Sequence, residues 1–206
     1  MPRNPPYRVG GRITLCGTRP IAMETQVIHI AGPGGAPYQL GQPMLMFSGR
    51  LFLGRVDPVQ VSNRGTEVHF GSFAPTSVAQ DEPRNIGALL FYEACGHIAH
   101  FHPQVQLVSF ASSRPMPGVG DPAVQAAARV AAVERIGATN IQVTPTHSGL
   151  ITVSGTWAYN ERNLHQLHVA LEEHRAVFRA VAIGRSDDWP SWLARLRRML
   201  AWPARG

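Results

Sequence analysis

One stretch, residues 67–101, limits most strongly what this chain can fold into. Apolar residues alternate around Val68 and Phe70, which predicts a strand. A polar loop follows, and from Ile86 onward apolar residues recur at helical spacing, after Pro83, a typical residue at the start of a helix. The first turn of a helix has unpaired backbone N–H groups and the positive end of the helix dipole. A strand, loop and helix in this order are therefore suited to holding an anion.

Two residue types strengthen the anion hypothesis. Arg84 would add a positive charge beside the first turn, and Gly87 would let a ligand approach the backbone closely. The sequence therefore predicts an anion cradle that is formed by Arg84, Asn85, Ile86, Gly87 and Ala88.

The rest of the chain has weaker but readable patterns. They predict strands within 12–31, at 38–47, 49–56, 67–73 and 104–112, a helix at 122–136, strands at 140–145 and 149–158, and a helix at 160–182. Turns are expected at 32–37, around Asp57-Pro58 and at 63–65. Asp121 and Pro122 are typical of a helix start, and Gly137 of a helix end.

This order predicts an α/β (α+β) fold: a single mixed, mostly antiparallel sheet flanked by helices, with an added C-terminal helix pair. We expect residues 1–11 to be a flexible arm and residues 12–185 to form a single α/β domain. Residues 186–206 read as an amphipathic basic C-terminal helix, either docked on the domain or bound to a membrane surface or a protein partner.

The element order resembles that of the GNAT superfamily of N-acetyltransferases over about residues 12–158. In that family, the anion-binding helix opens on Gln/Arg-x-x-Gly-x-Gly/Ala. The segment that starts at Arg84 is similar, although Leu89 replaces the last small residue. Residues 131–138 are similar to the end of the family's next helix, with Val133-Glu134 where the family usually has Tyr-Glu.

The resemblance implies an acyltransferase that moves an acetyl or acyl group from acyl-CoA to an amine acceptor. Acetyl-CoA would lie between the strands at 67–73 and 104–112, which splay apart in the family. The resemblance also implies that the first-turn residues Arg84 to Ala88 hold the pyrophosphate of acetyl-CoA. Backbone N–H groups near four residues would contact the acyl carbonyl and the pantetheine: Phe70, Gly71, Ser72 and Phe73.

Catalytic candidates follow from the same resemblance. Glu67 or His69 would be the general base, and the two share a strand face because they are two residues apart. The family's frequent acid, a tyrosine shortly after the strand at 104–112, is missing here. Tyr159 and Tyr92 are substitutes for that acid. Ser109 is one of only three serines in that stretch and its vicinity.

Other functions stay open. All 19 basic residues are arginine, the net charge is +6, and no lysine is present. Three explanations of the missing lysine stay open. The genome could be GC-rich and encode arginine in place of lysine. Alternatively, the protein could be a bacterial effector delivered into a host cell, or an acyltransferase that escapes self-modification. The alternative function is a non-catalytic basic module that binds nucleic acid, a membrane or a host protein, with nucleic acid less favoured. No secretory signal or membrane span is visible, which predicts a cytoplasmic protein.

Cysteines and histidines predict no further chemistry. Cys95 lies on an apolar helix and is expected to be a buried, inert thiol. The histidines at 97–102 and 165–174 lack the paired cysteines or the H-E-x-x-H pattern of a zinc site, so no metal is predicted.

Overall fold

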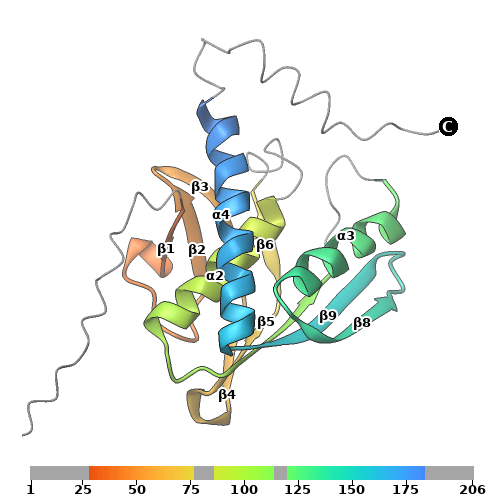
Figure 1. The fold of residues 1–206 in the computed structure, drawn as a ribbon, viewed down its shortest axis with the longest axis horizontal. Coiled ribbons are helices and arrows are strands. Elements are labelled where there is room, and N and C mark those ends of the chain that lie inside the picture. The colour runs from red at the N-terminus through yellow and green to blue at the C-terminus, as the bar shows by residue number, and fades with distance from the viewer. Residues whose placement is uncertain (1–27, 77–85, 114–119, 184–206) are drawn as a thin grey trace, which may run out of the picture.

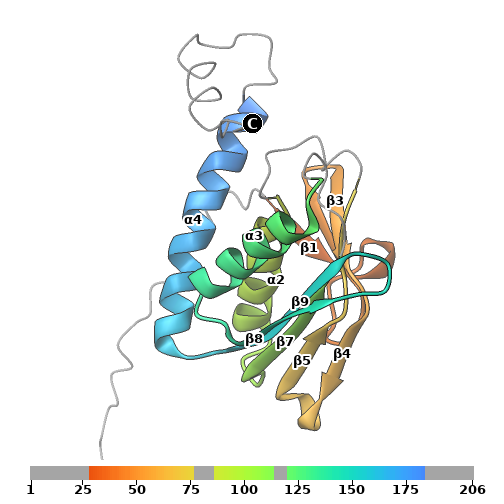
Figure 2. The same cartoon turned by 90° about the vertical axis from the view of Figure 1, so that its right-hand side faces the viewer.

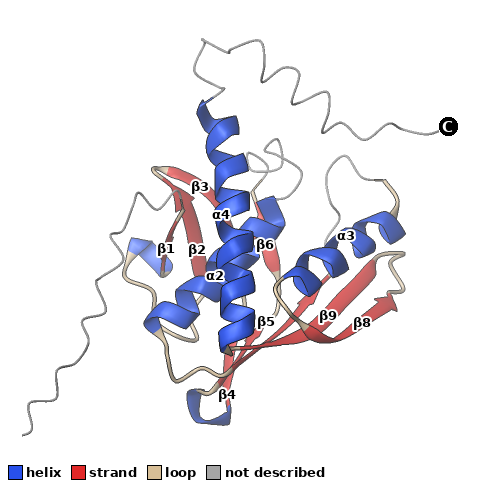
Figure 3. Ribbon diagram, viewed as in Figure 1, coloured by secondary structure: helices blue, strands red, loops and turns tan. Residues whose placement is uncertain are grey.

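The structure is a computed structural model that describes residues 28–76, 86–113 and 120–183. Strands make up the first part of the described chain apart from two short 3-10 turns, and the helices α2, α3 and α4 come after β6 (Figure 3). Their bounds are β1 His29–Ala31, β2 Met44–Ser48, β3 Leu51–Val56, β4 Val59–Ser62, β5 Glu67–Phe70, β6 Phe73–Pro75, α2 Ile86–Phe101, β7 Leu107–Ser112, α3 Pro122–Arg135, β8 Thr139–Pro145, β9 Ile151–Ala158 and α4 Glu161–Ile183.

The strands form two sheets, with the orders β1-β2-β3-β6 and β4-β5-β7-β9-β8. All neighbours are antiparallel except β5 and β7, which are parallel. The predicted mixed α/β class is confirmed, while β4 is an additional strand and the strand expected at 67–73 is divided into β5 and β6. The expected single sheet is divided into two, and the reason lies in the hairpin that joins them.

A long hairpin belongs to both sheets. β3 and β4 form one arm, β5 and β6 form the other, and the pairing register is the same before and after the break. The break falls at Asp57-Pro58, opposite Gly71-Ser72. Pro58 has no N–H and cannot complete the ladder. The turn expected around Asp57-Pro58 is therefore wrong: the chain continues into β4 and turns at Asn63–Gly65.

The α-helices of the described residues, α2, α3 and α4, lie on one side of the sheets (Figures 1 and 2). α3 packs on β8 and β9, while α2 contacts β6 and α4. Buried side chains alternate along the strands toward the helices, and Trp157 is fully buried. Its indole Nε1–H donates to the carbonyl oxygen of Ile136, 2.6 Å away. The opposite face of the β4–β8 sheet carries polar side chains.

Helix signals in the sequence are accurate where they can be compared. The Asp121 side chain accepts a hydrogen bond from the backbone N–H of Ala123 at 2.8 Å, and Gly137 follows α3 at a φ of 84°. Three predicted features lie outside the described residues: the arm at 1–11, the first part of the strand region at 12–27, and the helix at 186–206. No described helix is long and apolar enough to cross a membrane.

Candidate functional site

The centre of the candidate site is the point where β5/β6 and β7 part. β5 and β7 pair in parallel from Glu67 beside Leu107 to Phe70 beside Phe110. Beyond Phe70 the chain bends into β6 and pairs with β3 in the other sheet, while β7 continues beside β9. We call this point the fork. It is the splayed arrangement that the resemblance implied for the strands at 67–73 and 104–112.

His69 lies one residue before the fork, on the sheet face that the described helices leave open. Its Nδ1 is 2.9 Å from the hydroxyl oxygen of Ser109, its register partner on β7. Both side chains are partly buried, so the imidazole is held in place and still reachable. An imidazole that can be approached from solvent and is fixed by a neighbour is suited to proton transfer.

Glu67 shares this face with His69, as expected for residues two apart on a strand. It is partly buried, and its carboxylate accepts a hydrogen bond from the Ser62 hydroxyl at 3.4 Å, across the hairpin. Of the two base candidates, His69 is closer to the fork.

On the helix side of the fork, aromatic rings fill the space between the two sheets. Phe91 on α2 contacts Phe73 and Phe110 edge-on, with ring centroids 5.2 Å and 5.1 Å apart, and Phe70 lies against Phe73. Phe70 is fully buried, whereas Phe73 is partly exposed. The rings of these residues therefore form an apolar cluster that packs against the helix side of the fork.

Gly71 has a structural reason to be glycine. A Cβ there would lie 2.9 Å from Cδ of Pro58, and the Gly71 N–H donates to the Pro58 carbonyl oxygen at 3.0 Å. The carbonyl of Ser72 accepts from the Asp57 N–H, also at 3.0 Å. The Gly71 N–H is therefore already hydrogen-bonded within the protein. A backbone contact to an acyl group in this segment would have to come from a neighbouring residue.

The first turn of α2 is not covered by the described residues. A Cβ at Gly87 would meet none of their atoms within 4 Å, and Gly87 and Ala88 are both partly exposed. The Ile86 side chain is buried, so this residue faces the core and only its backbone is directed to the helix end. Arg84 and Asn85 lie outside the described residues.

Tyr159 is not brought to the fork. Its hydroxyl donates to the carbonyl oxygen of Cys95 on α2 at 2.9 Å, on the side of the sheet opposite His69. Burial raises its pKa well above the usual value of 10, with the charges of Cys95 and Tyr38 acting in the same direction. Tyr92 is similarly engaged, because its hydroxyl donates to the Ala132 carbonyl at 2.7 Å. The hydroxyls of both tyrosines thus bind backbone carbonyls of helices and lie away from the fork.

The expected inert thiol is confirmed: Cys95 is fully buried and free, and burial raises its pKa. Within the described ranges, no group of three His, Cys, Asp or Glu side chains could hold a metal ion. His165 and His168 lie exposed on α4.

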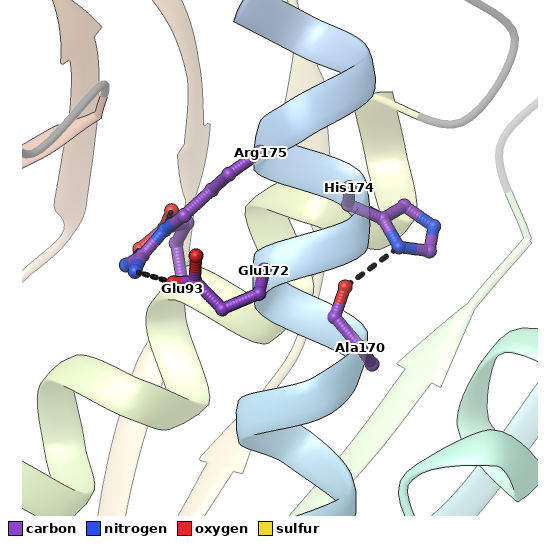
Figure 4. A network of polar contacts seen from close by, with 5 residues as sticks. All are labelled: Glu93, Ala170, Glu172, His174 and Arg175. Carbon is purple, nitrogen blue, oxygen red and sulfur yellow. Dashed lines mark hydrogen bonds and ion pairs between the residues drawn. The ribbon is translucent and has the colours of Figure 1, made fainter.

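A buried ion pair fastens α4 to α2 (Figure 4). The Arg175 guanidinium donates from Nε and Nη2 to the two carboxylate oxygens of Glu93, each at 2.7 Å, and from Nη1 to Glu172 at 3.2 Å. The Glu93 side chain is only 5% exposed. The hydrogen bond to Glu93 raises the pKa of Arg175, so the guanidinium stays charged. This pair holds the helix that opens beside the fork.

Sequence reasoning did not assign a role to Ser109. The signal was too weak, because a serine inside an apolar strand is ordinary and its partner depends on the register of two parallel strands far apart in the chain.

Comparison with known proteins adds distant likenesses in structure. No protein-family model matches the sequence. No curated protein matches it either. The chain is structurally similar to the NatC complex bound to Gag peptide and CoA, at 12% identity and a TM-score of 0.39, over 57% of this chain and 71% of that one.

Two further similar structures are bacterial. One is the N-terminal domain of a ribosomal-protein-alanine acetyltransferase from Clostridium acetobutylicum, at 9% identity and a TM-score of 0.42, over 68% of this chain and 97% of that one. The other is a GNAT-family acetyltransferase assigned in Desulfovibrio desulfuricans, at 13% identity and a TM-score of 0.37, over 57% and 68%. At these values the likeness concerns the arrangement of elements and assigns no activity.

Proposed function

We propose that this chain transfers an acyl group from acyl-CoA to an amine acceptor. The observation that carries the proposal is the position of His69, one residue before the fork and on the open face of the sheet. The open first turn of α2, at Gly87 and Ala88, supports it, because unpaired amides and the helix dipole favour a pyrophosphate there.

The residues would divide the work as follows. Acyl-CoA, when bound, supplies the activated thioester. Backbone N–H groups at the start of α2 would hold its pyrophosphate, and the fork would admit its pantetheine arm. His69 would take a proton from the amine as the N–C bond forms, then return it to the sulfur as the C–S bond breaks. Most of the rate gain in such a site comes from positioning.

A test of this proposal uses calorimetric titration of the full chain with acetyl-CoA. We expect Gly87→Glu to abolish binding, because a carboxylate placed in the open space at the helix start would repel the pyrophosphate. The helix itself should tolerate the change, since an acidic residue is favourable in a first turn.

Gly120→Glu is the matched control, because a Cβ at Gly120 also meets no described atom within 4 Å and the charge change is the same. This variant should bind acetyl-CoA like the unaltered chain. Equal affinity in all three proteins, or no binding by the unaltered chain, contradicts the proposal.

A further inference from the structure

We infer that Ser109 is a positioning residue for His69: its hydroxyl oxygen accepts the imidazole Nδ1–H and leaves Nε2 as the basic nitrogen. This inference rests on the proposed function, in which His69 is the general base. It adds a residue and a protonation state that the acyl-transfer scheme alone does not require.

The contact between the two side chains is built into the sheet. His69 and Ser109 are register partners on parallel central strands, and Nδ1 and Oγ lie 2.9 Å apart. Each strand is paired on both sides, β5 with β4 and β7, and β7 with β5 and β9. Because both backbones are held this way, the distance between the side chains is fixed by the ladder.

The other neighbour of Ser109 on this face does not compete with His69 for the Ser109 hydroxyl. Its register partner on the other side is Thr156, on the same open face. The Thr156 hydroxyl donates to the Thr139 carbonyl at 3.3 Å and accepts from the Asn140 side-chain amide at 3.2 Å. Thr156 is thus turned toward β8. Ser109 is left facing His69.

Asn140 can reach the Thr156 hydroxyl because β8 is irregular at this residue. The register of β8 against β9 shifts between Thr139 and Gln142, and Asn140 has a φ of 53°. A bulge of this kind re-aims a side chain, here toward Thr156.

The tautomer decides which nitrogen can act. A neutral imidazole has one N–H and one bare nitrogen, and the hydrogen bond at one of them sets the state of the other. A serine hydroxyl that accepts from Nδ1–H keeps this bond when the ring becomes an imidazolium, in which both nitrogens donate. A serine that donated to Nδ1 would have to turn away during the proton transfer. The accepting arrangement therefore fits both states of the base.

A covalent role for Ser109 fits less well. A nucleophilic serine needs backbone or side-chain donors for the oxyanion that forms at the attacked carbonyl. Ser109 lies in the middle of a strand that is paired on both sides, so the backbone around it is committed to the sheet. The structure favours positioning over acyl-enzyme formation.

Nitrogen NMR of the full chain, with ¹⁵N-labelled histidine, tests the inference without any need for activity. In the unaltered protein, the neutral His69 ring should show a protonated Nδ1 and a bare Nε2. Ser109→Ala should shift the ring toward the other tautomer, and Ser109→Thr, which keeps the hydroxyl on a strand-favouring residue, should restore it. Ser154→Ala, on the same face of β9, should change nothing.

Kinetics with acetyl-CoA and a panel of primary amines complete the test. Ser109→Ala should lower kcat by roughly tenfold or more, and by no more than the roughly 10²–10⁴-fold that a general base contributes, while the KM for acetyl-CoA is unchanged. A protonated Nε2 in the unaltered protein, or an acylated Ser109 in mass spectra, overturns the inference. Failure of every amine to be acylated, with the expected tautomer in place, instead overturns the proposed function.

Discussion

At the scale of single residues, packing requires glycine at some positions and not at others. A Cβ at Gly54 would lie 2.8 Å from the Ala74 carbonyl oxygen and 3.0 Å from the Leu90 side chain. At Gly87 a Cβ would meet no atom of the described residues within 4 Å, so their packing gives no reason for glycine in the first turn of α2. Helices generally disfavour glycine. Close approach of the proposed acyl-CoA would account for glycine at this position.

The two glycines should respond in opposite directions to the same substitution. Gly54→Ala should lower the free energy of unfolding by about 1–3 kcal/mol, the usual cost of overpacking. Gly87→Ala should raise it by up to about 1 kcal/mol, the difference in helix propensity. Urea denaturation measures both, and a loss of stability in Gly87→Ala would show that packing requires this glycine.

Tyr159 gives a second prediction at this scale. Because its hydroxyl donates to the Cys95 carbonyl, Tyr159→Phe should cost about 1 kcal/mol of stability and leave acyl-transfer kcat unchanged. Denaturation and steady-state kinetics on the same preparation separate the two effects. A large fall in kcat without a loss of stability would return Tyr159 to the role of acid.

At the scale of elements, the sequence predicted individual helices and strands better than their partners. The cap at Asp121, the strand at 104–112 and the helix at 160–182 follow from local signals and are found with small shifts. The pairing of β5 with β7 and the ion pair between α2 and α4 depend on contacts between distant segments. Glu93 shows the limit, since a glutamate within an apolar stripe gives no indication of its partner.

Replacing only one partner of the α2–α4 ion pair should lower the free energy of unfolding strongly. Arg175→Met would leave the Glu93 carboxylate buried without a partner, and we expect a loss of about 3–5 kcal/mol in the free energy of unfolding. The double variant Glu93→Leu/Arg175→Met should lose less, because it leaves no buried charge.

Arg179→Met provides the control, since Arg179 lies exposed on the same helix. It should be close to the unaltered chain in urea denaturation. If Arg175→Met were no less stable than the double variant, the pair would have no structural importance.

At the scale of the whole molecule, one bent hairpin explains both the two sheets and the fork. Its break depends on Pro58 opposite Gly71, and the sequence predicts a turn around Asp57-Pro58 instead. The sequence could not show that the strand resumes after Pro58, because four residues of β4 are too short to give a clear pattern. The described helices α2, α3 and α4 lie on one side of the β4–β8 sheet (Figure 2), and His69, on the other face, is partly exposed.

Acid should destabilise the whole fold through its partly buried histidines. Burial lowers the pKa of His97 from 6.5 to about 4, with the charges of His102 and His100 in the same direction. Between these two pH values the unfolded chain binds a proton that the folded chain does not. Stability is therefore fully present above pH 6.5 and falls as the pH drops toward 4.

His97→Phe should flatten this part of the pH–stability curve, measured by urea denaturation at steps from pH 7 to pH 4. Some slope should remain, because burial also lowers the pKa of His102 and of His174. His165→Gln, an exposed position on α4, should leave the curve as it is. An unchanged curve in His97→Phe would mean that His97 does not carry the acid sensitivity.

The most direct test of the proposed acyl-CoA site at the fork is an amide NMR titration of the full chain with acetyl-CoA. We expect saturable shifts in two groups of amides, those from Gly71 to Phe73 beside the fork and those of Gly87 and Ala88 at the start of α2. Shifts confined to other parts of the chain, or no saturable shifts at all, would contradict the account.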